Sequence, residues 1–259
     1  MNFFVYSFTI WQREIIRFLR QRSRIIGTLG QPFLFWILLG SGFGTSFRLN
    51  GVELSEGYLE YFFPGILVMM ILFTAIFSTF SIIEDRKMGF LQAVLVAPVP
   101  REAIILGHIL GGATLSILQG VLFLCAAPIV GISLTLEVIG LSFLSMLVMS
   151  FALTSLGLIF AWKIESTQGF HSIMNLFLIP LWLMSGAVFP ESSAHPIVGW
   201  FMKINPLTYG VTILRRSLYP LQNKMIEGLP ETVTCWIVIT CSTLIIFVIA
   251  SLTAKKYQG

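Results

Sequence analysis

The residues that could perform acid–base or metal chemistry are few in this 259-residue chain, and they lie far apart. The candidates are three histidines and two glutamates: His108, His171, His195, Glu137 and Glu165. They fall in different segments, at none of the spacings that metal ligands or catalytic pairs require. This scatter argues against a single active site, a metal site or a cofactor.

The chain also lacks a common means of binding a nucleotide. No G-x-x-x-x-G-K-[ST] sequence occurs in it, and that loop supplies the backbone N–H groups and the lysine that hold ATP phosphates. The chain therefore cannot bind ATP by that route. Any ATP hydrolysis that drives it must come from a partner.

The stretch EDRKMGFLQAVLVAPVPRE, residues 84–102, places a short apolar segment between charges and prolines. As a helix, Met88–Ala97 would be about 15 Å long, half of what a bilayer requires. Its apolar side chains recur at helical spacing, and two prolines end it: Phe90, Leu91, Val94, Leu95, Pro98 and Pro100. Such a helix at a water-facing surface suits a protein partner. The alternative is that it lies on the membrane or packs under the chain's own helices.

Composition indicates what surrounds this segment. Hydrophobic residues make up 56% of the chain and charged residues only 11%, whereas a soluble domain carries about a quarter charged residues. The sequence therefore predicts one all-α integral membrane domain, residues 1–259, with six apolar runs long enough to span a bilayer. These are Ile25–Phe47, Phe62–Ile83, Ala103–Val130, Leu141–Trp162, Phe170–Phe189 and Val233–Ala254.

Charge sets the expected orientation. With both termini in the cytoplasm, most of the 16 lysines and arginines fall on the cytoplasmic side, as membrane proteins require. The net charge of +4 then reflects topology and indicates no nucleic-acid partner. Residues 1–24 place Phe4, Phe8, Trp11, Ile15 and Phe18 opposite Arg13, Arg17, Arg20 and Arg24. This predicts an interfacial amphipathic helix with its apolar face in membrane lipid and its arginines toward headgroups and cytosol. The alternative is a basic cluster that only sets topology.

The region 190–232 is predicted to be re-entrant from the outer side. Its apolar run Ile197–Leu214 is interrupted at Asn205-Pro206, and a full span there would bury Lys203 in the bilayer. Two half-helices that dip into the outer leaflet and return avoid that cost. The alternative is a simple extracellular loop.

Aromatic residues of the second span could line a transport path. Phe73, Phe77 and Phe80 share one helical face among hydroxyl residues, and Asn175 lies in the fifth span. Such a lining suits an amphiphilic cargo, although a phenylalanine stripe can equally serve packing or lipid contact. The spans carry no charge at mid-depth, which argues against a secondary transporter driven by protons or sodium.

Several segments together resemble the permease subunit of ABC-2 type exporters. They are WQREIIRFLRQRSRIIGTLGQPFLFWILLG, PGILVMM, EDRKMGFLQAVLVAPVPR, ILGHIL, MSGAVFP and INPLTYGVTILR, in that order. The resemblance covers nearly the whole chain. Within the family it is similar to daunorubicin-resistance, nodulation-factor and polysaccharide export permeases.

The resemblance implies a half-channel in a bacterial cytoplasmic (inner) membrane that exports an amphiphilic, lipid-linked or drug-like cargo. It would pair with a second copy or a related permease, and the complex would use two copies of a separate ATPase subunit. The segment Met88–Ala97 would be the coupling helix that docks on the ATPase, with Gly89, Leu91 and Pro98 matching the family pattern. Gln92 departs from the usual glutamate of that pattern. A secondary transporter or an intramembrane enzyme are the alternatives.

Overall fold

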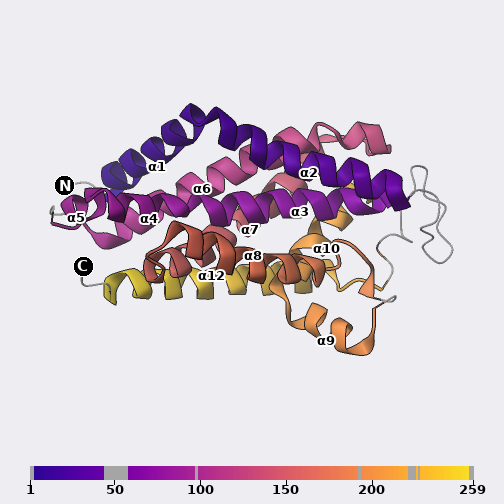
Figure 1. The fold of residues 1–259 in the computed structure, drawn as a ribbon. Coiled ribbons are helices and arrows are strands. Elements are labelled where there is room, and N and C mark those ends of the chain that lie inside the picture. The colour runs from indigo at the N-terminus through magenta and orange to yellow at the C-terminus, as the bar shows by residue number, and fades with distance from the viewer. Residues whose placement is uncertain are drawn as a thin grey trace.

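The computed structural model describes residues 3–43, 58–96, 99–191, 194–220, 226 and 228–256, and within these ranges it contains helices and no strand. Figure 1 shows the long helices running side by side, with both chain termini and α5 at one end and α9 near the other. The helices are α1 Phe3–Arg20, α2 Arg22–Phe43, α3 Tyr58–Ser78, α4 Phe80–Lys87, α5 Phe90–Val96, α6 Arg101–Leu124, α7 Leu136–Lys163, α8 Thr167–Leu183, α9 Pro196–Ile204, α10 Pro206–Leu218 and α12 Thr232–Lys256.

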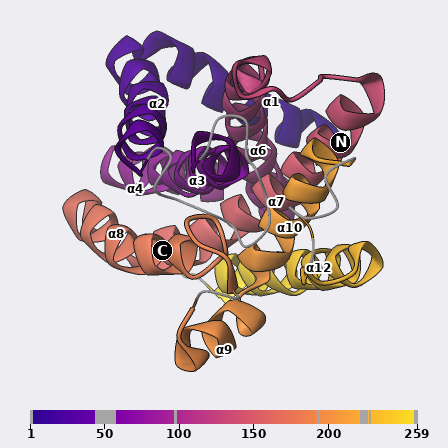
Figure 2. The same ribbon diagram turned by 90° about the vertical axis from the view of Figure 1, so that its right-hand side faces the viewer.

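Helix α3 forms the centre of the structure. Every residue of it is buried except Leu59, Phe73 and Phe77, and α2, α6 and α7 pack around it (Figure 2). The break between α3 and α4 falls at Thr79, whose hydroxyl donates to the Ile76 carbonyl at 2.7 Å. Such bonds from a hydroxyl to a carbonyl of the preceding turn bend helices. The bend therefore joins the buried α3 to the charged α4.

Among the residues that the structure describes, five helices are long and apolar enough to cross a membrane: Ile25–Gly42, Tyr58–Lys87, Arg101–Leu124, Leu136–Lys163 and Thr232–Lys255. They match five of the six predicted spans. The predicted end at Val130 is wrong, because α6 stops at Leu124 and a separate 3₁₀ turn follows at Ala127–Val130. The end of the first predicted span, residues 44–47, lies outside the described residues.

The fifth predicted span, Phe170–Phe189, corresponds to α8. This helix begins at Thr167 with Ser166 as its N-cap and ends at Leu183. It ends early because the chain turns at Gly186, whose φ of +75° favours glycine. Its 17 residues reach about 26 Å, a little less than the hydrocarbon core of about 30 Å.

The N-terminal helix is present but lies differently from the prediction. It packs along α6, where Ser7 donates to the Ala103 carbonyl and Trp11 to Thr114, both at 3.0 Å. Phe4 and Phe8 are exposed as predicted for an apolar face, but Phe18 is buried. The expectation that its arginines all face headgroups and cytosol is also wrong for two of them, which bind α4.

Candidate functional site

The short segment after the second span is a helix set off by a glycine turn. Helix α4 ends at Lys87, and Gly89 has a φ of +76°, which a residue with a side chain rarely adopts. Gly89 thus lets the chain leave α4 and start α5, a helix of seven residues from Phe90 to Val96. The helix is shorter than the predicted Met88–Ala97. Ala97, Pro98 and the side chain of Leu95 lie outside the described residues.

The apolar side chains of α5 do not share one exposed face. Leu91, one of the apolar residues predicted to couple to the ATPase, is only 2% exposed and belongs to the hydrophobic core. Met88 and Val96 are largely exposed, and Phe90 is partly exposed. Leu91 therefore fixes α5 to the body of the protein. Phe90 and Val96 of α5, together with Met88 just before it, form an accessible apolar surface that we call the α5 surface.

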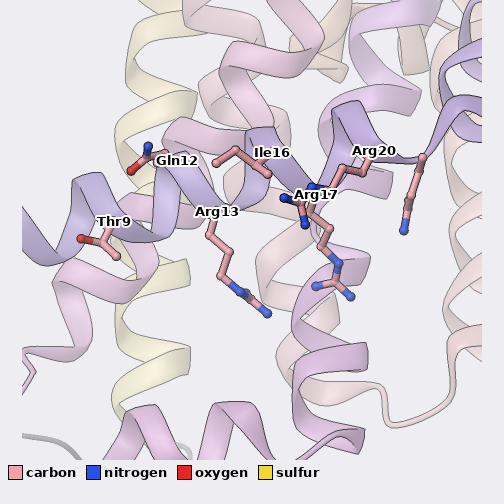
Figure 3. A pocket seen from close by; sticks show the side chains of 7 residues that line it. Thr9, Gln12, Arg13, Ile16, Arg17 and Arg20 are labelled. Carbon is pink, nitrogen blue, oxygen red and sulfur yellow. The ribbon is translucent and has the colours of Figure 1, made fainter.

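A groove runs between α5 and α1. Its volume is about 290 Å³, and its lining is Tyr6, Thr9, Ile10, Arg13, Phe90, Ala93, Val94 and Val99. The guanidinium of Arg13 stacks on the ring of Phe90, 4.0 Å from its centroid. A second groove continues along α1, where Arg13, Arg17 and Arg20 line it (Figure 3). The α5 surface thus adjoins a row of arginines on α1.

Arginines of α1 bind carboxylates of α4. Arg13 holds Asp85 through two hydrogen bonds of 2.6 Å, and this interaction raises the pKa of the Arg13 guanidinium. Arg17 adds a 3.0 Å bond to Asp85 and pairs with Glu84. Asp85 is 1% exposed. The charges of residues 84–87 are therefore not simply a solvated run: α4 uses Glu84 and Asp85 to hold α1.

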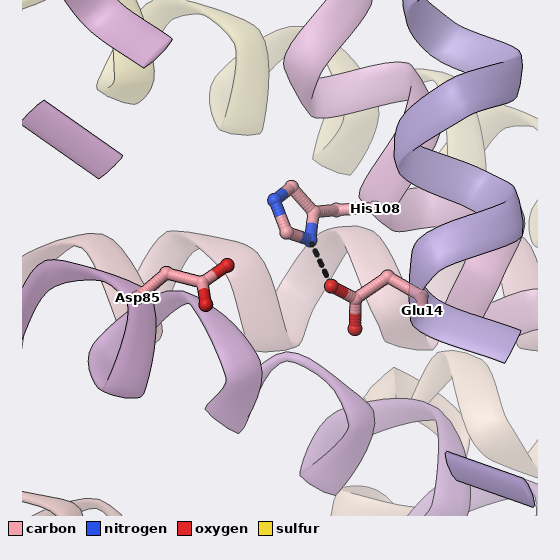
Figure 4. Close-up of side chains that lie close together, drawn as sticks. All are labelled: Glu14, Asp85 and His108. Carbon is pink, nitrogen blue, oxygen red and sulfur yellow. Dashed lines mark ion pairs between the residues drawn. The ribbon is translucent and has the colours of Figure 1, made fainter. Parts of the chain in front are cut away.

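The same carboxylate lies near a buried histidine. His108 Nδ1 is 3.5 Å from Glu14 Oε1, and Asp85 lies beside them (Figure 4). Ligand atoms of these three residues lie within 4.8 Å of one another, a spacing that could hold a metal ion. However, both Asp85 oxygens accept hydrogen bonds from Arg13, which also lies 3.4 Å from Glu14. A divalent cation would have to displace or face two guanidinium groups, so this donor set does not fit a metal ion.

We call these six residues the α1–α4 charge network: Arg13, Glu14, Arg17, Glu84, Asp85 and His108. The sequence did not indicate this network, because the only acids considered with the histidines were Glu137 and Glu165, whereas the acids beside His108 are Glu14 and Asp85. The pattern on α1 offered one signal. A glutamate between two arginines, inside an otherwise amphipathic helix, faces the protein and is buried.

The predicted path residues share a partly open face beside α8. Phe73 and Phe77 are partly exposed, unlike the α3 residues around them. Their ring centroids are 5.8 Å apart. The His171 ring of α8 lies 4.7 Å from Phe77 and 5.2 Å from Phe80. Asn175 is exposed one turn further along α8. The structure thus adds His171 to the three phenylalanines, a contact that no sequence spacing indicated.

The chain breaks at Asn205-Pro206, between α9 and α10. The Asn205 amide nitrogen donates to the carbonyls of Leu181 and Met184 at 2.7 and 3.0 Å, and its Oδ1 accepts from the Leu207 N–H at 3.0 Å. Asn205 is thus the N-cap of α10, and Pro206 takes the first helical position. One side chain satisfies polar groups of both α8 and α10.

Two arginines near the end of α10 are held by neutral groups. Arg215 is buried, lies over the Tyr61 ring at 4.1 Å and donates to the Gly186 carbonyl at 3.1 Å. Arg216 donates to the carbonyls of Leu229 and Pro230, both at 3.0 Å. We call Asn205, Arg215 and Arg216 the α10 anchor. Sequence analysis had counted the two arginines only as outer charges.

A family model for the ABC-2 type transporter matches residues 7–219. The chain belongs to the ABC-2 type transporter family. The match spans α1 to α10 and so includes the α1–α4 charge network, α5 and the break at Asn205.

Curated relatives of this ABC-2 protein are transport proteins by name. It is 27% identical to the transport permease ycf38 of Cyanophora paradoxa, over 80% of this chain and 72% of that one. It is 26% identical to the inner membrane transport permease YadH of Escherichia coli, with 80% of each chain covered. Nodulation protein J of Sinorhizobium fredii is 24% identical over 81% and 79%. The chain is therefore a multi-pass membrane permease of the ABC-2 family.

Proposed function

We propose that this permease is the membrane subunit of an ATP-driven exporter in a bacterial cytoplasmic membrane. Two separate ATPase subunits would drive it, together with a second permease copy, identical or related. The observation that carries the proposal is the α5 surface, within the family match and at the end of the molecule where both termini lie (Figure 1). The chain has no phosphate-binding loop of its own.

The α5 surface has the properties of a docking site. Met88, Phe90 and Val96 expose apolar side chains on a segment that lies between two spans, next to the arginines of α1. Burial of each such side chain against a partner is worth about 1.5–3 kcal/mol. Leu91 packs into the core and Arg13 of α1 stacks on Phe90, so a displacement of α5 by a bound partner would be transmitted directly to α1 and α4.

A pair of matched substitutions tests this proposal. Val96 is 87% exposed and Leu136, at the start of α7, is 88% exposed, so Val96→Asp and Leu136→Asp place the same charge at equally open sites. Val96→Asp should weaken binding of the ATPase by about tenfold or more. Leu136→Asp should leave it unchanged. The measurement is the amount of ATPase that co-purifies, with cargo export as a second readout. Equal retention of the ATPase by both variants would exclude α5 as the docking site.

We further propose that the cargo passes along the face formed by Phe73, Phe77, Phe80, His171 and Asn175. In Figure 2, α2 and α8 lie on the same side of α3, and His171 of α8 contacts Phe77 and Phe80. A second permease copy facing it would enclose a path lined by aromatic rings and two polar side chains. Such a lining suits an amphiphilic, lipid-linked or drug-like molecule, because rings contact its apolar part and polar groups its head.

The proposal includes six spans with both termini in the cytoplasm, α8 being the fifth of them, and α9 and α10 re-entering from the outside. Helices α1 and α12 start and end at the same end of the bundle, which supports this topology (Figure 1). In intact cells, a cysteine in place of Glu191, after α8, should react with an impermeant thiol reagent, and one in place of Glu165, before α8, should not. Equal labelling of both would exclude α8 as a span.

A further inference from the structure

A groove of about 210 Å³ lies between α7, α8, α10 and α12. Its lining is almost wholly apolar: Met149, Ala152, Leu153, Leu156, Phe177, Leu181, Asn205, Pro206, Leu207, Ile239, Ser242 and Ile246. The residues on α7 and α12 come from the middle of those helices, which are both candidate spans. The groove is therefore at the depth of the hydrocarbon layer.

The groove has almost no hydrogen-bond partners for a water molecule. Of its two polar residues, Asn205 already makes three hydrogen bonds, to Leu181, Met184 and Leu207. A buried water needs two to four polar partners, and an apolar cavity of about 150 Å³ stays dry and accepts a hydrocarbon. Ser242 alone does not supply those partners. A hydrocarbon is thus the occupant that this lining favours.

The surroundings indicate which hydrocarbon can reach the groove. Next to it, α12 exposes Leu244, Ile245 and Val248, side chains that suit contact with bilayer lipid. Helix α9 stands apart from the other helices in both views (Figures 1 and 2) and exposes a row of apolar side chains, Ile197, Trp200, Phe201 and Ile204. Exposed aromatic residues of this kind are typical of the membrane interface. The groove adjoins the end of this helix, because Asn205, the C-cap of α9, lines it.

We propose that this groove binds one acyl chain of a bilayer phospholipid, with the headgroup at the level of α9. The one charged residue of α9, Pro196–Ile204, is Lys203, which pairs with Glu191 at 3.2 Å. Because the two charges of this pair cancel, it favours neither a cationic nor an anionic headgroup. The site therefore recognises the acyl chain of the lipid and not its headgroup. It is separate from the proposed cargo path, because Asn175 and Phe177 point about 160° apart around α8.

Photo-crosslinking tests the site in the full-length protein. The probe is phosphatidylcholine with a diazirine in one acyl chain, at a low fraction in phosphatidylcholine vesicles that contain the permease. Ile239 is 4% exposed and lines the groove, whereas Leu244 is 59% exposed on the same helix. Lipid outside the groove reaches only Leu244. We expect Ile239 and Leu244 to be labelled to similar extents, and labelling confined to Leu244 would overturn the proposal.

Filling the groove gives the second measurement. Ser242→Phe places a ring among the lining residues and should reduce labelling of Ile239 at least fivefold, with labelling of Leu244 unchanged. Leu147→Phe is the matched control, because Leu147 is exposed on α7 and does not line the groove. Unchanged labelling of Ile239 in a folded Ser242→Phe protein would mean that the probe reaches it by another route, and the site would be rejected. If that variant does not fold, the comparison of Ile239 with Leu244 in the unaltered protein still decides.

Discussion

The α1–α4 charge network and the α10 anchor both hold arginines inside a largely apolar protein, but with different partners. In the network, Arg13 and Arg17 bind the carboxylates of Asp85 and Glu84. In the anchor, Arg215 and Arg216 donate to backbone carbonyls. The first contact joins opposite charges on two helices, and the second joins a charge to neutral dipoles.

This difference bears on what each contact does. A buried carboxylate that loses its guanidinium partners becomes an uncompensated charge, so separation of α1 from α4 is costly unless another charged group or water replaces the partner. Carbonyl groups that lose a donor remain neutral and cost less. The network, which lies against α5, is thus suited to a contact that an ATPase partner could open or close. The anchor is suited to fixing α10 in one place.

The largest effect is expected at Asp85. Asp85→Asn keeps the shape of the side chain but leaves Arg13 and Arg17 facing a neutral group. Breaking a buried ion pair from one side costs about 3–5 kcal/mol, and the lower end applies because Arg13 is 30% exposed. A loss of about 3 kcal/mol should lower the midpoint of thermal unfolding by roughly 6–12 °C in detergent.

A neighbouring pair supplies the control. Glu84 is 31% exposed whereas Asp85 is 1% exposed, and pairs that involve an exposed charge contribute about 1 kcal/mol or less. Glu84→Gln should therefore shift the midpoint much less than Asp85→Asn. If the two variants unfold at the same temperature, the buried Asp85 contributes no more to thermal stability than the exposed Glu84. The network would then be an ordinary surface ion-pair cluster.

Sequence could predict those features that depend on local chemistry. The break at Asn205-Pro206 was predictable because an asparagine cap and a first-turn proline act within two residues. Long apolar runs likewise predicted six spans, of which five correspond to candidate spans among the described residues, since length and hydropathy are properties of one segment. The end of α8 at Leu183 was harder to predict from the sequence, because it depends on the turn at Gly186.

Contacts between distant segments could not be predicted in the same way. Arg13 and Asp85 are 72 residues apart, and no local pattern around either residue indicates that the two are in contact. Leu91 shows the same limit: the i, i+4 pattern placed it on an apolar face, but only packing against the core decides which apolar residues face inward. The sequence thus predicted that α5 is short and apolar, and the fold decides that Met88 and Val96, not Leu91, are accessible.

A smaller effect is expected at the α10 anchor. Arg215→Leu removes the donor to the Gly186 carbonyl and the stacking on Tyr61, which leaves neutral acceptors unpaired at a cost of about 1–3 kcal/mol. It also removes a buried charge, and that offsets part of the loss because an apolar residue needs no solvation. The net change in unfolding free energy should be about 1 kcal/mol, smaller than for Asp85→Asn.

Glu60 provides the test of whether this contrast is real. It is buried on α3, and its backbone carbonyl accepts from the hydroxyl of Tyr219, close to Arg215. If Arg215 is held mainly by carbonyls, Glu60→Gln and Arg215→Leu should lower thermal stability independently, and the double variant should show the sum of both losses. If Glu60 is instead its ionic partner, the double variant will lose less than that sum, and Arg215→Leu alone will cost as much as Asp85→Asn. That result would make the anchor a second charge pair, because the contact that holds α10 would then be stabilised by opposite charges, as the contact between α1 and α4 is.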